Sequence, residues 1–165
     1  MKSAIISDIH DNLANLKKCL AWCADNKIDS IICCGDITNI DTVSYLSKNF
    51  PGDIYVVSGN ADLYDERDLG KFKNINFYGE IAVNEIGKVN IGFCHEPEKI
   101  KKVKELAPFK LDFIFYGHTH KPWLEKEDGI IIANPGTLAG VFTPATFSTL
   151  DHATKNLELK ILSEI

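Results

Sequence analysis

Side chains of the kinds that bind metal ions stand directly after several short apolar runs in this sequence. Seven of them, carrying carboxylate, imidazole or amide groups, are Asp8, His10, Asp36, Asn60, His95, His118 and His120. Imidazole nitrogen combined with carboxylate and amide oxygen favours manganese, iron, zinc, cobalt or nickel over magnesium alone. Seven ligands exceed what one such ion usually takes, but they suffice for two ions if a carboxylate bridges them. The sequence therefore predicts a dinuclear site that activates water and attracts an anionic substrate.

The spacing of these residues supports a common site. Asp8 and His10 are two positions apart on what we expect to be extended chain, so their side chains leave on the same side, and His118 and His120 repeat that spacing. A glycine precedes three of the seven residues, which suits sharp turns and close approach of the backbone. Ligands of α/β proteins bind beyond the carboxyl ends of the strands, where these residues stand.

Each residue taken singly also has a structural interpretation. A lone histidine at a strand end often serves only as a hydrogen-bonded structural residue, Asp36 alone would cap the next helix, and Asn60 alone would hold a turn. Four of the five histidines stand at predicted strand ends, which caps alone do not explain. The fifth, His152, falls in an apparent turn, where we expect a solvated side chain, and it is left out of the site.

Composition places further limits on function. The 165 residues fit one domain, residues 1–165, with 45% hydrophobic residues and no apolar stretch of membrane-spanning length. Without a signal-peptide pattern, we expect a cytoplasmic protein. The formal net charge of −5 argues against binding of extended nucleic acid, which needs a basic surface. The odd count of five cysteines predicts reduced thiols packed in the core.

Apolar periodicity in the first half of the chain alternates between strand and helix. It predicts strands at 2–7, 30–34 and 53–58, with helices at 13–26 and 41–48 between them. Such alternation is typical of a parallel sheet covered by helices.

The second half of the chain is richer in strands. The patterns predict a hairpin of 77–85 with 89–94, a helix at 98–106, a strand at 112–116, a hairpin of 123–126 with 130–133, and a closing pair of 146–151 with 157–162. The whole is therefore expected to be an α/β protein of two packed mixed sheets with helices outside.

The order of the seven residues resembles the pattern of the calcineurin-like metallophosphoesterase family, in which D-x-H is followed by G-D, G-N, H and G-H-x-H. The corresponding residues here are Asp8-x-His10, Gly35-Asp36, Gly59-Asn60, His95 and Gly117-His118-Thr119-His120, spread along essentially the whole chain. The short length, Pro122 and the stretch Asn134-Pro135-Gly136-Thr137 resemble the small single-domain branch of YfcE-like phosphodiesterases. The resemblance implies a four-layer α-β-β-α sandwich of two mixed sheets flanked by helices, with the site at one end of the sheets.

The resemblance also implies ligand assignments and an activity. One ion would be held by Asp8, His10, Asp36 and His120, and the other by Asp36, Asn60, His95 and His118. Asp36 would then bridge two divalent ions, manganese first among manganese, nickel, zinc, iron and cobalt. A metal-bridging hydroxide would hydrolyse a small phosphodiester, with Asn60 also contacting the substrate. The family further suggests a homodimer or homotetramer.

Two other functions remain open. A phosphomonoesterase would use the same dinuclear site. A non-catalytic scaffold of the same fold, like the metallophosphoesterase-like subunit of retromer, need not keep a complete metal set, whereas this sequence has one.

The chain departs from the family pattern after the G-N pair. Many larger members have histidine there, placed to protonate the leaving group, whereas this chain has Ala61 followed by Asp62. Loss of a positioned general acid costs roughly 10²–10⁴ in rate, which predicts slow hydrolysis unless the leaving group is acidic. Asp62 either supplies the proton or caps the next segment, and we weigh the two interpretations equally.

Two charged residues near the site have open functions. Glu96 follows His95, and extended chain should point it away from that histidine. Arg67, the single arginine, would clamp a substrate phosphate bidentately, but its acidic neighbours favour a surface ion pair.

Overall fold

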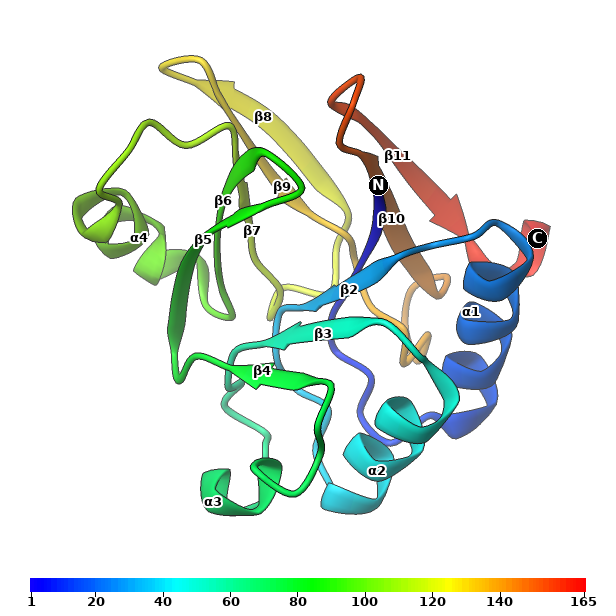
Figure 1. Ribbon diagram of the computed structural model, residues 1–165. Coiled ribbons are helices and arrows are strands. Elements are labelled where there is room, and N and C mark those ends of the chain that lie inside the picture. Colours follow the sequence, from blue (N-terminus) through cyan, green and yellow to red (C-terminus); the bar gives the residue numbers. More distant parts are fainter.

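Two β-sheets pack face to face in the computed structural model, which describes residues 1–165 (Figure 1). The first sheet contains β1 (Lys2–Ile6), β2 (Ser30–Cys33), β3 (Asp53–Val56), β4 (Ile75–Phe77), β10 (Thr146–Asp151) and β11 (Asn156–Ile161). Their order across the sheet is β11-β10-β1-β2-β3-β4. The second sheet contains β5 (Ile81–Ile86), β6 (Val89–Cys94), β7 (Phe113–Phe115), β8 (Trp123–Glu127) and β9 (Ile130–Asn134), in the order β5-β6-β7-β9-β8. Both sheets are mixed, as expected.

Crossover helices make the centre of the first sheet parallel. α1 (Leu13–Asp25) connects β1 to β2, and α2 (Ile40–Asn49) connects β2 to β3. The side chain of Asn12 caps α1 by accepting a hydrogen bond from the Asn15 amide. Buried residues of α1 recur at intervals of three and four, at Leu16, Cys19, Leu20 and Cys23, so one stripe of the helix faces the sheet.

Three apolar cores separate four layers. The largest, with 19 buried residues, lies between α1 and α2 and the first sheet, and a second, with 13, fills the space between the two sheets. A third lies between the second sheet and α4 (Ile100–Leu106), which stands on the side opposite α1 (Figure 1). The α-β-β-α sandwich expected from the sequence is therefore confirmed.

All five cysteines are buried within these cores as free thiols. Cys19, Cys23 and Cys33 belong to the core beneath α1, Cys34 lies between the sheets, and Cys94 lies beneath α4. None of the helices has both the length and the apolar character that crossing a membrane requires.

The predicted N-terminal boundary of one hairpin strand was wrong. Residues 77–85 were expected to form one strand, but Phe77 ends β4 in the first sheet and β5 begins only at Ile81 in the second. Between them the chain turns at Gly79, which has a φ of 68°. The Tyr78 amide donates to the Val56 carbonyl and thereby keeps this segment beside β3.

The predicted helix at 98–106 begins instead as a single 3₁₀ turn, η1 (Pro97–Lys99), followed by α4. A short helix, α3 (Glu66–Leu69), and a C-terminal 3₁₀ turn, η2 (Leu162–Glu164), complete the elements.

The prediction that His152 is solvated was wrong. Its residue is only 6% exposed, and its ring spans the two sheets at the end where β1 begins. Nδ1 lies 2.8 Å from the Ile86 carbonyl, and Nε2 lies 2.6 Å from Oγ of Ser3, which in turn bonds Ser30. These partners are distant in sequence, so the turn motif alone did not indicate them.

Candidate metal centre

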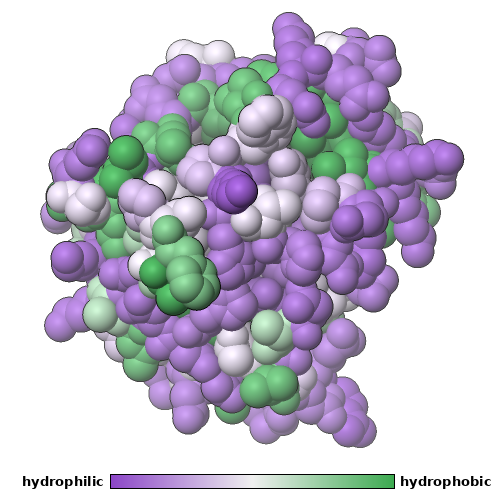
Figure 2. Space-filling model, turned by 180° about the vertical axis from the view of Figure 1, so that it is seen from behind, coloured by the Kyte–Doolittle hydropathy of each residue, from purple (hydrophilic) through white to green (hydrophobic).

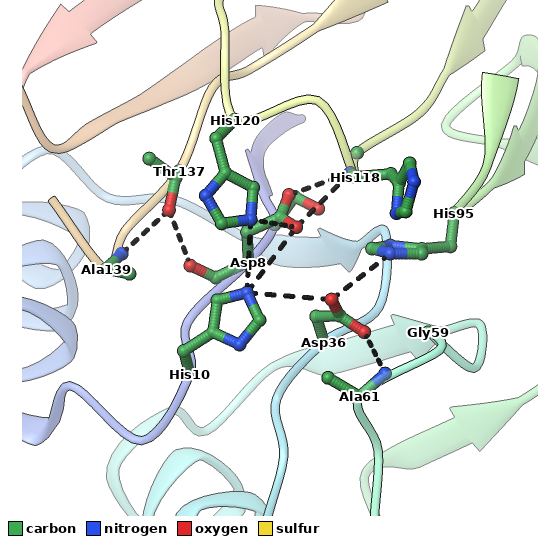
Figure 3. A network of polar contacts seen from close by, with 12 residues as sticks. Asp8, His10, Asp36, Gly59, Ala61, His95, His118, His120, Thr137 and Ala139 are labelled. Carbon is green, nitrogen blue, oxygen red and sulfur yellow. Dashed lines mark hydrogen bonds and ion pairs between the residues drawn. The ribbon is translucent and has the colours of Figure 1, made fainter. Parts of the chain in front are cut away.

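Five loops meet at one end of the sandwich and bring the predicted ligands together (Figure 3). They follow β1, β2, β3, β6 and β7, all of which run parallel within their sheets and so present their carboxyl ends at one edge. In Figure 3 the side chains of Asp8, His10, Asp36, His95 and His120 point toward one another from these loops.

One group of ligand atoms is formed by Asp8, His10 and His120. Nε2 of His120 lies 3.1 Å from Oδ1 of Asp8 and 3.2 Å from Nε2 of His10. Nε2 of His10 lies 3.8 Å from the same Asp8 oxygen. Two imidazole nitrogens and a carboxylate oxygen therefore face one small volume.

A second group is formed by Asp8, Asp36 and His95. Oδ2 of Asp36 lies 3.3 Å from Nε2 of His95 and 3.6 Å from Nε2 of His10, so this oxygen stands between the two groups. Oδ1 of Asn60 lies 3.0 Å from Nε2 of His95 and 2.8 Å from Nδ1 of His118. All seven residues that the sequence singled out are thus gathered in one place.

Hydrogen bonds outside the centre orient some of these ligands. Nδ1 of His95 lies 2.7 Å from the Cys34 carbonyl, which fixes the ring and leaves Nε2 facing Asp36. Metal-binding histidines commonly donate their second ring nitrogen to a carbonyl in this way. Oδ1 of Asp36 accepts the Ala61 amide at 2.8 Å, which leaves Oδ2 directed at the histidines.

Burial and charge shift the pKa values of three groups. Burial raises the pKa of Asp8 above its ordinary value, although Ser7 and nearby histidines oppose the shift. Burial also acts to raise the pKa of Asp36, but hydrogen bonds from His95 and the Ala61 amide outweigh it, so the pKa falls. Burial alone would lower the pKa of His95, but the Asp36 carboxylate raises it overall. The centre is thus a partly desolvated site with strong internal charge interactions.

The backbone at the ligands is unusual. Asp8, His10, Asp36, His118 and His120 have φ values of 54°, 45°, 55°, 66° and 58°, in the left-handed region that residues other than glycine seldom adopt. Such conformations persist only where the surrounding structure enforces them, and they cluster at functional sites. The expectation that Asp8, His10, His118 and His120 lie on extended chain was therefore wrong, because all four have a positive φ.

Two of the glycines next to ligands are required by close packing. A Cβ at Gly59 would collide with the backbone amide and the carboxylate of Asp36, and a Cβ at Gly117 would collide with Oγ of Ser7 and approach Oδ2 of Asp8. The close backbone approach expected from the sequence is therefore present at both positions.

The loop after β9 supports the centre, although the sequence pattern predicted no such role for it. Oγ1 of Thr137 donates to the Asp8 carbonyl at 2.8 Å (Figure 3). The Ala139 amide donates to the same carbonyl at 2.9 Å. The buried Asn134 side chain donates to the Gly117 carbonyl at 2.7 Å and so holds the loop that carries His118. The apolar run before this polar stretch indicates a loop at a strand end, but it does not indicate which other loops that stretch contacts.

The three remaining residues considered from the sequence make structural contacts. Both carboxylate oxygens of Asp62 accept backbone amides, from Thr38 at 2.8 Å and Gly59 at 2.7 Å. Arg67 lies on α3 with a side chain 90% exposed, and it pairs with Asp65, the N-cap of that helix, rather than with any residue of the centre. Glu96 pairs with Lys99 at 2.5 Å.

Fold and site together place the chain among proteins of the metallophosphoesterase fold. The sequence matches the calcineurin-like phosphoesterase superfamily domain over residues 1–155, and the chain belongs to this family. Among individual proteins it is similar to phosphodiesterase MJ0936 of Methanocaldococcus jannaschii, with 26% identity over 151 residues that make up 87% of each chain.

Solved structures give the same result for the fold. A novel archaeal phosphodiesterase is similar with a TM-score of 0.84 and 26% identity, covering 98% of this chain and 99% of that chain. YfcE, a phosphoesterase from E. coli, has a TM-score of 0.67 at 19% identity over 98% and 100% of the chains, and Vps29 from Chaetomium thermophilum has 0.72 at 19% over 97% and 96%. The last two likenesses concern the fold alone.

Membership in this family implies binding of divalent metal, and the residues present fit it. The donors are imidazole nitrogens and carboxylate and amide oxygens, the set that borderline divalent ions prefer. Nε2 of His10 and Nε2 of His120 converge at 3.2 Å beside the Asp8 carboxylate, an arrangement that a shared cation explains.

Proposed function

We propose that the protein hydrolyses small phosphodiesters with two divalent ions, manganese first, held by its seven convergent ligands. One observation carries the proposal: Oδ2 of Asp36 faces His10 on one side and His95 on the other. A carboxylate in that place is suited to bridge two ions, with Asp8, His10 and His120 beside one and Asn60, His95 and His118 beside the other.

The bound ions would supply positive charge for the phosphoryl oxygens and acidify water. The fold orients the side chains that would bind these ions. Left-handed backbone and the bonds from Thr137 and Ala139 fix Asp8, and the Cys34 carbonyl fixes the His95 ring. Donors placed in advance need not reorganise during the reaction, which is a large part of catalysis.

Asn60 is suited to bind the substrate as well. Its Oδ1 faces His95 and His118, whereas its Nδ2 makes no hydrogen bond within the protein. The residue is exposed, so this amide can donate to a phosphoryl oxygen of the ester.

The leaving group receives little help from the residue after Asn60. Ala61 carries no ionisable side chain, and its amide is committed to Asp36. Both oxygens of Asp62 are committed to backbone amides. The site therefore favours esters whose leaving group departs without protonation, such as phenols with electron-withdrawing groups.

The direct test is metal reconstitution. The protein is stripped with chelator, reloaded with manganese, nickel, zinc or magnesium, and assayed with bis-p-nitrophenyl phosphate and p-nitrophenyl phosphate. We expect turnover of the diester, highest with a borderline metal, and a loss of at least about 100-fold in Asp36→Asn. Asp41→Asn, on the exposed side of α2, is the matched control and should behave as wild type.

The alternatives give different results. Faster turnover of the monoester in wild type would favour the phosphomonoesterase. Tight metal binding without turnover of either ester would contradict hydrolysis and favour a scaffold.

A further inference from the structure

Two adjacent apolar side chains in the loop after β9 are unusually exposed. Phe142 is 95% exposed and Val141 is 69% exposed, although both residue types are normally buried. Figure 2 shows that hydrophobic surface on the face it displays occurs as separate patches within a mostly hydrophilic surface. An aromatic ring held in water with nothing packed on it suggests a contact made by a ligand.

This loop is tied to the metal centre on both sides of the exposed pair. Before it, the Ala139 amide donates to the Asp8 carbonyl at 2.9 Å. After it, Oγ1 of Thr143 donates to the His120 carbonyl at 3.2 Å. Phe142 directly precedes Thr143, and consecutive Cα atoms are about 3.8 Å apart. The Phe142 backbone is therefore adjacent to the residue that contacts the His120 carbonyl. This backbone lies next to the loop that carries His120, at the rim of the centre.

The base of the loop is held firmly while its apex is free. Nδ2 of Asn12 donates to the Ala139 carbonyl at 2.8 Å, and Nδ2 of Asn15 donates to the Leu138 carbonyl at 2.7 Å. On the far side the Leu162 amide donates to the Ala145 carbonyl at 2.8 Å. The base of the loop is therefore fixed, while the Phe142 ring at its apex is exposed and can adjust to a bound group.

We propose that Phe142, with Val141 beside it, receives a planar organic group of the ester whose phosphorus lies at the metal centre. The inference rests on the proposed function and narrows its substrates to esters carrying an aryl or nucleobase group. Such a group would bury apolar surface and stack on the Phe142 ring. Stacking tolerates different aryl groups and nucleobases, because each has a π-face. Two side chains are too few for a protein interface, which buries about 800 Å² per partner.

The test measures binding rather than turnover, with ligands that cannot be hydrolysed. Phenylphosphonate and methylphosphonate differ only in the group that would meet Phe142, and each has a stable carbon–phosphorus bond. Titration calorimetry on the manganese-loaded protein should show about three- to tenfold tighter binding of phenylphosphonate. Phe142→Ala should bring the two affinities together, whereas Phe142→Trp should retain the preference.

Controls separate this inference from the proposed function. Phe109→Ala removes a partly exposed phenylalanine between α4 and β7 and should leave the preference unchanged. Inorganic phosphate should bind wild type and Phe142→Ala equally, because it does not reach the rim. Equal affinity of wild type for the two phosphonates, or an unchanged preference in Phe142→Ala, would overturn the inference alone. If loaded wild type bound neither phosphonate nor phosphate, the proposed function would fail with it.

Discussion

Asp8 does more at the residue scale than offer a ligand atom. Its amide donates to the Gly35 carbonyl, its carbonyl accepts Thr137 and Ala139, and its carboxylate accepts the His118 amide. It thereby joins loops from both sheets. Substitution of Asp8 would keep the backbone bonds but remove the carboxylate that accepts the His118 amide, so it would disturb the His118 loop together with metal binding and is a poor probe of either alone. His10, whose side chain is 29% exposed, is the cleaner probe of the ligand set.

Left-handed backbone at five ligands has an energetic implication. Each such conformation costs of order 1–3 kcal/mol for a residue other than glycine, and the surrounding loops must offset it. Two carboxylates are also desolvated in the same place, with Asp8 fully buried and Asp36 2% exposed. The ligand positions are therefore imposed by the fold, at some expense to its stability.

Asp62 offers a decisive test between the two interpretations that the sequence left open. Both of its oxygens accept backbone amides, so we expect it to hold the loops of Thr38 and Gly59 rather than donate a proton. In Asp62→Asn, the new side-chain NH₂ group would face one of the two backbone N–H donors and could not accept its hydrogen bond. It should lower turnover by similar factors for bis-p-nitrophenyl phosphate and diphenyl phosphate, measured with the same metal.

A proton donor would behave otherwise. Its loss should hardly affect the nitrophenyl ester and should slow the phenyl ester by roughly 10²–10⁴. That divergence would restore Asp62 to the chemistry. Asp65→Asn, which weakens the exposed pair with Arg67 but keeps a side-chain oxygen that can cap α3, serves as the control.

At the scale of elements, the convergence of the seven predicted ligands could be foreseen because each follows a strand whose apolar run is visible in the sequence. The carboxyl ends of parallel strands meet at one edge, so local patterns sufficed to gather residues from position 8 to position 120. The supporting contacts of Thr137 and Asn134 depend on which loops become neighbours, and no local pattern encodes that.

The division between β4 and β5 shows where local reasoning fails. Residues 77–85 were predicted as one strand, and only the pairing of Ile75–Phe77 with β3 shows that Phe77 belongs to the other sheet. His152 was misjudged for the same reason, since its burial depends on Ser3 and Ile86, far away in sequence.

The buried His152 predicts a pH-dependent stability. Burial lowers its pKa below the ordinary value, despite the hydrogen bond to Ile86, so the unfolded chain binds this proton more readily than the folded one. The contribution to the free energy of unfolding is complete above about pH 6.5 and declines as the pH falls, by at most about 1.4 kcal/mol per pH unit. Thermal unfolding of wild type and His152→Gln between pH 7.5 and 5 should show a shallower decline in the variant.

Ser3→Ala is the matched comparison for that experiment. It removes a hydrogen-bond partner of His152 but keeps the titrating ring. We expect a lower melting temperature than wild type at pH 7.5 but a similar decline toward pH 5. Parallel declines in wild type and His152→Gln would mean that this histidine does not titrate on unfolding.

At the scale of the whole molecule, the sandwich concentrates strain and charge at one end and stabilising contacts elsewhere. The 19- and 13-residue cores stabilise the packing of the two sheets. That stability offsets the cost of the left-handed backbone in the loops that carry the predicted ligands. The homodimer or homotetramer suggested by family resemblance stays a prediction that sedimentation or light scattering can examine.

The five buried cysteines give the folded chain a built-in reporter. Desolvation raises the pKa of Cys94 to about 12 and raises those of Cys33 and Cys34 as well, so these thiols are poor nucleophiles while packed. A chromogenic disulfide reagent should therefore titrate close to no equivalents in native buffer and five in denaturant.

The rate at which each cysteine is labelled then reports how often the layer that covers it opens. Cys94 lies beneath α4, whereas Cys19 and Cys23 lie beneath α1, so mass spectrometry of partly labelled chains would show which outer layer lifts first. Adding manganese should slow modification at sites whose exposure requires the ligand loops to separate.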